Sequence, residues 1–191
     1  MSRVGIFGGS FDPIHNGHLI TAMHVKEVRN LDKIIFIPCH ISPHKLAGGH
    51  SLPDDRLNIV KSAVSGITGF EVSDFELRKG AVSYSIDTIK HFKKKYDEID
   101  LIIGYDNLLV FESWKSPDEI TQLVNLVVLK RKTESEEKSN RFFKFAHFVD
   151  TPIIEISSTE IRKRISQNKP VNFLIPEKVL NYITKKNLYR F

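Results

Sequence analysis

The chain has 191 residues, of which 41% are hydrophobic and 27% charged, a composition that argues against a disordered tail or a membrane-spanning protein. Its net charge of +5 is mild and suits an anionic small molecule such as a nucleotide, although charge alone does not exclude RNA. The single cysteine, Cys39, excludes an internal disulfide, and no signal-peptide pattern is present, so we expect a cytoplasmic protein that does not enter membranes.

Hydrophobic patterning in the first half of the chain predicts alternating strands and helices. In chain order we expect a strand at Val4–Phe7, a helix from Gly17 to about Asn30, a strand at Ile34–Pro38, a polar loop at Cys39–His50, a helix capped by Ser51, a strand at Phe70–Val72 and an extended piece through Phe75 and Leu77.

The second half continues the alternation. In chain order we expect a helix at Ser85–Tyr96, a strand at Leu101–Gly104, a helix at Asp118–Leu123, a strand at Leu126–Leu129, a polar surface loop at residues 132–141, a phenylalanine-rich core strand at residues 142–148, a strand at Ile153–Ile156, and helices at Ser158–Gln167 and Pro176–Lys186. Uninterrupted apolar strands that alternate with helices are typical of an α/β protein with an open parallel sheet covered on both faces.

The most informative segment is Gly8–His18, with the sequence GGSFDPIHNGH, which joins the first predicted strand to the first helix. Ligands of open parallel sheets bind at the carboxyl ends of the strands, where this segment lies. Glycines allow close approach of the backbone to a ligand, and the free N–H groups of a helix N-terminus attract phosphate. His15 and His18, three residues apart, can point to one side of the turn and donate hydrogen bonds to phosphate oxygens.

This segment resembles the H-x-G-H signature of the nucleotidyltransferase superfamily. A second element of that superfamily is found near the other end of the chain, where Ile156–Arg162 reads ISSTEIR and is similar to an I-S-S-T-x-I-R pattern. Hydroxyl groups and backbone N–H groups at a helix start, with an arginine one turn further on, also form an anion site. Read alone, the segment would fit an ordinary helix cap equally well.

Four further segments resemble the bacterial nicotinate-nucleotide adenylyltransferase family. They are Ile37–Lys45, Gly80–Thr88, Gly104–Trp114 and the tail from Val171 to Tyr189. The resemblance implies a Rossmann-like sheet with helices on both faces, in a single nucleotidyltransferase domain spanning residues 1–191 whose C-terminal helical portion begins at about residue 157. Three departures from the family pattern are Ser42 in place of a loop proline, Ser85 in place of threonine, and Tyr105 in place of a small residue. The last would put a bulky ring beside the nucleotide.

The resemblance implies adenylyl transfer from ATP to nicotinate mononucleotide, with Mg²⁺ carried on the ATP phosphates and no metal held by the protein. It assigns catalysis to His15, His18 and Arg162. The residues that it places along ATP are Gly8, Ser10, Phe11, His15, His18, Gly104, Ser157, Ser158 and Arg162. Those that it places around the mononucleotide are Lys45, Tyr84, Ser85, Asp106, Trp114 and Lys115.

Other interpretations compete with this one. An enzyme that uses nicotinamide mononucleotide is the nearest alternative. A zinc site built from Cys39, His40, His44 and His50 has suitable ligand types but no standard spacing. An NAD-dependent oxidoreductase lacks its G-x-G-x-x-G fingerprint here, and a nucleic-acid-binding module lacks a basic and aromatic motif. The sequence carries no signal for the oligomeric state.

Overall fold

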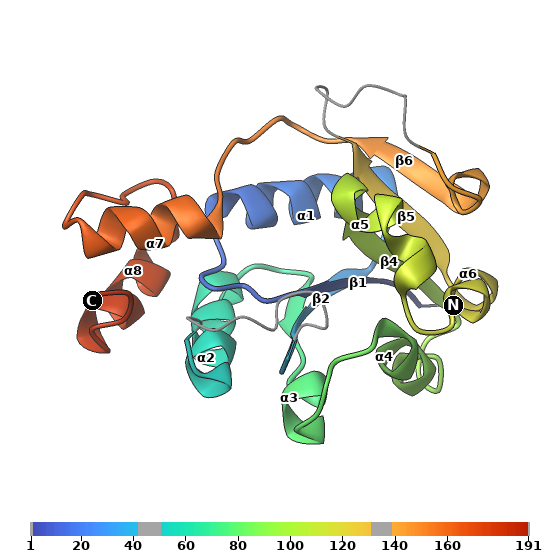
Figure 1. The fold of residues 1–191 in the computed structure, drawn as a ribbon, viewed down its shortest axis with the longest axis horizontal. Helices are drawn as coiled ribbons and strands as arrows, with labels where there is room; N and C mark the ends of the chain where they lie inside the picture. The colour runs from blue at the N-terminus through green and yellow to red at the C-terminus, as the bar shows by residue number, and fades with distance from the viewer. Residues whose placement is uncertain (1, 42–50, 131–138, 191) are drawn as a thin grey trace.

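The computed structural model describes residues 2–41, 51–130 and 139–190. Its strands form one parallel sheet in the order β3-β2-β1-β4-β5-β6 (Figure 1). The strands are β1 (Arg3–Gly9), β2 (Lys33–Pro38), β3 (Phe70–Val72), β4 (Glu98–Gly104), β5 (Asn125–Lys130) and β6 (Ala146–Asp150). The predicted open parallel sheet is therefore confirmed.

Helices connect the strands and extend the chain beyond the last of them. The α-helices are α1 (Asn16–Val28), α2 (Pro53–Val64), α3 (Phe75–Lys79), α4 (Ser85–Phe92), α5 (Tyr105–Leu109), α6 (Pro117–Leu123), α7 (Ser158–Ser166) and α8 (Glu177–Lys185). Two short 3₁₀ helices are η1 (Phe111–Ser113) and η2 (Phe143–Phe145). No helix in the described ranges is long and apolar enough to cross a bilayer.

Each face of the sheet has its own hydrophobic core, because successive side chains of a strand point to opposite faces. Phe7 and Ile102 belong to the core that α1, α2, α7 and α8 cover. Ile6 and Leu101 belong to the core beneath α4, α5 and α6. Figure 1 shows α7 and α8 at one end of the molecule, next to α2 and the start of α1. The C-terminal helices thus share a core with the helix that follows the first strand.

The expected last strand was wrong in its position. Residues 153–156 have no regular structure, and the Ile153 side chain is 52% exposed. The sixth strand is instead β6, which pairs with β5 at the edge of the sheet. Only Val149 in β6 is buried, and the predicted phenylalanine-rich strand at residues 142–148 overlaps β6 only at residues 146–148.

The phenylalanine-rich segment is only partly a core strand. Phe142 is fully buried, but residues 143–145 form η2, and Phe145 and Phe148 are 42% and 43% exposed. Pairing with β5, rather than hydrophobicity, therefore determines where the chain becomes extended here.

Three local expectations also differ from the structure. The expected extended piece through Phe75 and Leu77 is the short helix α3, which ends at Gly80 in the left-handed region with φ of 64°. Ser51 does not cap α2: the N-cap is Leu52, without a side-chain bond, and the N–H of Ser51 donates to Asp12 instead. Helix α4 ends at Phe92, four residues earlier than expected.

Candidate active site

Two cavities open at the carboxyl ends of β1 and β4, the neighbouring strands at the centre of the sheet. From β1 the chain continues to β2 on one side, and from β4 it continues to β5 on the other. Such a reversal in strand order is where open α/β sheets bind ligands. The smaller cavity has a volume of about 280 Å³ and the larger about 750 Å³, and Phe7, Ser10 and Gly104 line both. Ligands in the two cavities would therefore meet over the ends of β1 and β4.

The turn between β1 and α1 brings the two predicted histidines together in the larger cavity. His15 is the N-cap of α1, and its Nδ1 accepts from the N–H of His18 at 3.3 Å, while Nδ1 of His18 accepts from the N–H of His15 at 3.2 Å. The rings stack with centroids 3.6 Å apart. Because both Nδ1 atoms accept, the proton of each neutral ring is on Nε2, so each ring can donate through Nε2.

The N-terminus of α7 faces the same cavity and contacts the turn between β1 and α1. Ser157 caps α7 by accepting from the N–H of Glu160 at 3.2 Å. The Ser158 hydroxyl donates to the Pro13 carbonyl at 2.8 Å, and Arg162 donates to the Asp12 carbonyl at 2.7 Å. The ISSTEIR segment therefore serves as a helix cap and also lies on the cavity wall, and the two interpretations of it are compatible.

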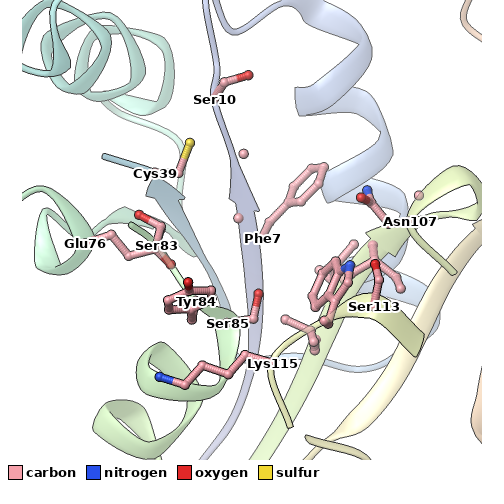
Figure 2. Close-up of a pocket in the computed structure, with 17 residues that line it drawn as sticks. Phe7, Ser10, Cys39, Glu76, Ser83, Tyr84, Ser85, Asn107, Ser113 and Lys115 are labelled. Atoms are coloured by element: carbon pink, nitrogen blue, oxygen red, sulfur yellow. The ribbon is translucent and has the colours of Figure 1, made fainter. Parts of the chain in front are cut away.

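The smaller cavity is lined by four of the residues that the family resemblance places around the mononucleotide. Its wall includes Tyr84, Ser85, Trp114 and Lys115. In Figure 2, Tyr84 and Lys115 lie on one side of Phe7, with Asn107 opposite them. The Lys115 ammonium lies over the Tyr84 ring, 4.6 Å from its centroid, and Ser85 is the first residue of α4. This wall combines aromatic faces, a cation and a helix N-terminus, a set that favours a flat anionic ligand.

Sequence reasoning missed two buried charged residues at this site. Glu76 lines the smaller cavity and accepts from the Thr88 hydroxyl at 2.6 Å, and burial raises the pKa of its carboxyl group. Arg56 is 4% exposed and donates to the carbonyls of Ser10 and His40 at 3.0 Å each. Neither residue stands in a recognisable motif. The packing of α3 brings Glu76 to the wall of the smaller cavity, whereas Arg56 in α2 lines neither cavity and bonds the backbone of Ser10, which lines both.

Some predicted ATP contacts lie elsewhere than expected. Gly8 lines the smaller cavity rather than the larger one. Phe11 lines neither cavity: its side chain is 2% exposed and packs edge-to-face against Phe7 at a centroid distance of 5.8 Å. Phe11 is therefore placed as a support beneath the turn.

The structure also gives the positions of Asp106 and Tyr105. Asp106 is exposed at the start of α5 and lines neither cavity, and Lys45 lies outside the described residues. The Tyr105 ring, expected beside the nucleotide, instead packs in the core and meets the Phe143 ring edge-to-face at 5.8 Å. The bulky substitution therefore leaves both cavities open.

Metal-ligating side chains do not gather in the described part of the chain: no group of three or more His, Cys, Asp or Glu residues there could hold an ion. The alternative zinc site included His44 and His50, which lie outside the described residues.

Comparisons with known proteins point to one family. The cytidylyltransferase-like family model matches residues 6–164. A probable nicotinate-nucleotide adenylyltransferase from Clostridium tetani is 42% identical, with all of both chains covered. One from Caldicellulosiruptor saccharolyticus is 38% identical, covering 98% of this chain and 99% of the relative.

A solved structure supports the fold. Plasmodium falciparum nicotinic acid mononucleotide adenylyltransferase complexed with NaAD superposes with a TM-score of 0.79 at 20% identity, over 99% of this chain and 98% of that one. The resemblance that the sequence motifs carry is thus confirmed over nearly the whole length. This chain belongs to the cytidylyltransferase-like family and, within it, to the nicotinate-nucleotide adenylyltransferases.

Proposed function

We propose that the protein transfers the adenylyl group of ATP to nicotinate mononucleotide, giving nicotinate adenine dinucleotide and pyrophosphate in NAD biosynthesis. The observation that carries this proposal is the pair of cavities that share Phe7, Ser10 and Gly104. Two nucleotides bound side by side there would have their phosphates over the same strand ends. Adenylyl transfer needs this arrangement, because one phosphate attacks the other.

The larger cavity suits ATP and the smaller one suits the mononucleotide ring. The larger is lined by groups that favour phosphates: His15, His18, the α7 N-terminus and Arg162. The smaller is lined by Trp114 and Tyr84, whose rings can stack on a pyridine. We further propose that Asp106 bonds ribose hydroxyls and that Lys45 meets the mononucleotide phosphate.

The chemistry requires positioning and charge stabilisation rather than a base. An oxygen of the mononucleotide phosphate, already ionised at neutral pH, attacks the α-phosphorus of ATP. The bond from that phosphorus to the bridging oxygen breaks, and pyrophosphate leaves with the electron pair. Nε2–H of His18 would donate to the α-phosphate as charge develops there, and Arg162 would hold the pyrophosphate.

ATP would enter as its Mg²⁺ complex, with the ion keeping mostly water ligands. We treat residues 1–191 as one nucleotidyltransferase domain, since Ile161 in α7 and Val179 in α8 share a core with Phe7 in β1. A chain with the single cysteine Cys39 suits a reducing compartment, and we place the protein in the cytoplasm.

Release of pyrophosphate from MgATP tests the proposed function. It should depend on added nicotinate mononucleotide and be accompanied by formation of the dinucleotide. Equal or better use of nicotinamide mononucleotide would favour the amide enzyme instead. Absence of release with either mononucleotide would overturn adenylyl transfer and reopen the oxidoreductase and nucleic-acid-binding interpretations.

Replacing Arg162 by alanine should weaken the use of ATP, because the variant loses a cation beside the leaving pyrophosphate. We expect a rise in the KM for MgATP and a fall in kcat of about tenfold or more, since a hydrogen bond to a charged group is worth about 1.5–3 kcal/mol. Steady-state kinetics with Lys163→Ala as the control would check this, because Lys163 is an exposed cation on the same helix. Unchanged kcat and KM in Arg162→Ala would show that Arg162 has only a structural role.

Replacing Trp114 by alanine should lower kcat/KM for both mononucleotides by about tenfold, since aromatic pairs contribute about 0.5–1.5 kcal/mol beyond burial of their area. The preference between acid and amide should keep its sign, because both rings stack alike. Trp114→Phe, which keeps an aromatic face, should recover most of the loss. If Trp114→Ala had the kcat/KM of wild type, Trp114 would not contribute to binding of the mononucleotide.

A further inference from the structure

The C-terminal part of the chain forms several hydrogen bonds with the histidine turn, defined here as residues 10–18. The side chain of Asn16 donates to the Phe173 carbonyl at 2.7 Å, and its backbone N–H donates to the Leu174 carbonyl at 2.9 Å. Together with the bonds from α7 described above, these contacts hold the turn from outside the sheet. The segment around His15 is therefore bonded to residues more than 140 positions away in the sequence.

The most deeply buried of these contacts joins Tyr189 to Asp12. The Tyr189 hydroxyl donates to Oδ1 of Asp12 at 2.7 Å, and the two residues are 4% and 1% exposed. Burial, with the Asp12 carboxylate second, raises the pKa of the Tyr189 hydroxyl, so this group stays a proton donor. The Tyr189 backbone is in the left-handed region, with φ of 62°, an unfavourable conformation that the surrounding structure must hold.

We propose that Tyr189 is a positioning residue for adenylyl transfer: by donating to Asp12, it fixes the histidine turn so that Nε2 of His15 and His18 faces the ATP cavity. A buried carboxylate that loses a donor pays a desolvation cost and moves toward other donors or water. Asp12 is only three residues before His15, so its movement would displace the reciprocal histidine cap. The proposal rests on the proposed function, since its effect is on that reaction.

A second tyrosine allows this role to be separated from simple anchoring of the tail. The Tyr182 hydroxyl in α8 donates to Oδ1 of Asp55 in α2 at 2.9 Å and accepts from the Asn58 side chain at 3.2 Å. This bond is of the same chemical kind and also ties the C-terminal part to the body of the protein. Neither partner of this bond belongs to the histidine turn, and Tyr182 lines neither of the two cavities at the strand ends.

The test compares Tyr189→Phe with Tyr182→Phe in the full chain. For each variant, kcat and both KM values are measured with MgATP and nicotinate mononucleotide, together with the thermal unfolding midpoint. We expect Tyr189→Phe to lower kcat by about tenfold or more, since small misplacements of reacting groups cost up to about a hundredfold. Its KM for the mononucleotide should stay within about twofold of wild type, because that ligand occupies the other cavity. Tyr182→Phe should lower the unfolding midpoint but leave kcat within about twofold of wild type.

A spectroscopic measurement reports directly on the conformation of the two histidine rings. Nitrogen-15 NMR of the histidine rings should show the Nε2–H tautomer of His15 and His18 in the wild type and in Tyr182→Phe, and a mixed or shifted pattern in Tyr189→Phe. If Tyr189→Phe does not fold, Asp12→Ala replaces it, because alanine offers no acceptor to the Tyr189 hydroxyl, and the same loss of kcat is expected.

The outcomes separate the two proposals. A folded Tyr189→Phe, or a folded Asp12→Ala in its place, with the kcat and ring signals of wild type would overturn the positioning role while the proposed function stands. A loss of kcat as large in Tyr182→Phe would also overturn it, because tail anchoring would then be the cause. A wild-type protein that forms no dinucleotide would overturn the proposed function itself.

Discussion

Replacing His18 by alanine should lower kcat by about a hundredfold to a thousandfold. The loss of one donor to a developing negative charge costs about 2.7–4 kcal/mol of transition-state stabilisation. His18 is the third residue of α1, it lines the ATP cavity, and its ring carries its proton on Nε2 because Nδ1 accepts from the His15 backbone at 3.2 Å. Steady-state kinetics with saturating MgATP and mononucleotide would measure the effect.

The variant also loses half of a helix cap, so its stability must be measured beside its activity. Loss of a capping side chain costs about 0.5–2 kcal/mol, which thermal unfolding would detect. His24→Ala is the matched control, since His24 is on the same helix and lines neither of the two cavities. If folded His18→Ala kept the kcat of wild type, His18 would have no catalytic role.

The second large effect that we expect is a preference for nicotinate over nicotinamide mononucleotide of about a hundredfold or more. The two rings have nearly the same shape, so hydrogen-bond donors must distinguish the carboxylate from the amide. The smaller cavity offers the Ser85 hydroxyl and the N-terminus of α4, whose first N–H groups lack intrahelical partners. Two bonds to a charged group at about 1.5–3 kcal/mol each give this ratio, while an amide NH₂ would face donors.

Replacing Ser85 by alanine should lower the ratio of kcat/KM for nicotinate mononucleotide to kcat/KM for nicotinamide mononucleotide, because the variant loses one hydrogen-bond donor to the carboxylate. Ser113 provides the control: it lines the same cavity, but its hydroxyl already donates to the Val110 carbonyl at 2.7 Å. Ser113→Ala should therefore leave the ratio unchanged. A wild-type enzyme that uses both mononucleotides equally well would show that the donor array is wrong and favour the amide enzyme.

The strands of the central sheet and the two motifs of the ATP cavity could be predicted from the sequence, because their signals are local. The β1, β2, β4 and β5 strands are apolar runs buried on both faces, and hydrophobic patterning alone predicts them. The turn from Gly8 to His18 and the segment from Ile156 to Arg162 carry their chemistry within a few residues. Their meeting in one cavity followed from the resemblance and from the rule that ligands bind at the carboxyl ends of parallel strands.

Tertiary structure alone decided the rest, because the deciding contacts join residues far apart in the chain. The edge strand β6 forms by pairing with β5, although only Val149 in it is buried. Tyr105 is turned into the core by its packing against Phe143, and Glu76 reaches the smaller cavity because α3 is a helix. The bond between Asp12 and Tyr189 spans 177 positions, and no periodicity or motif encodes such a pairing. The sequence thus determined the sheet and the chemistry of its two motifs, whereas the geometry of the site depends on burial and hydrogen bonding that exist only once the chain has folded.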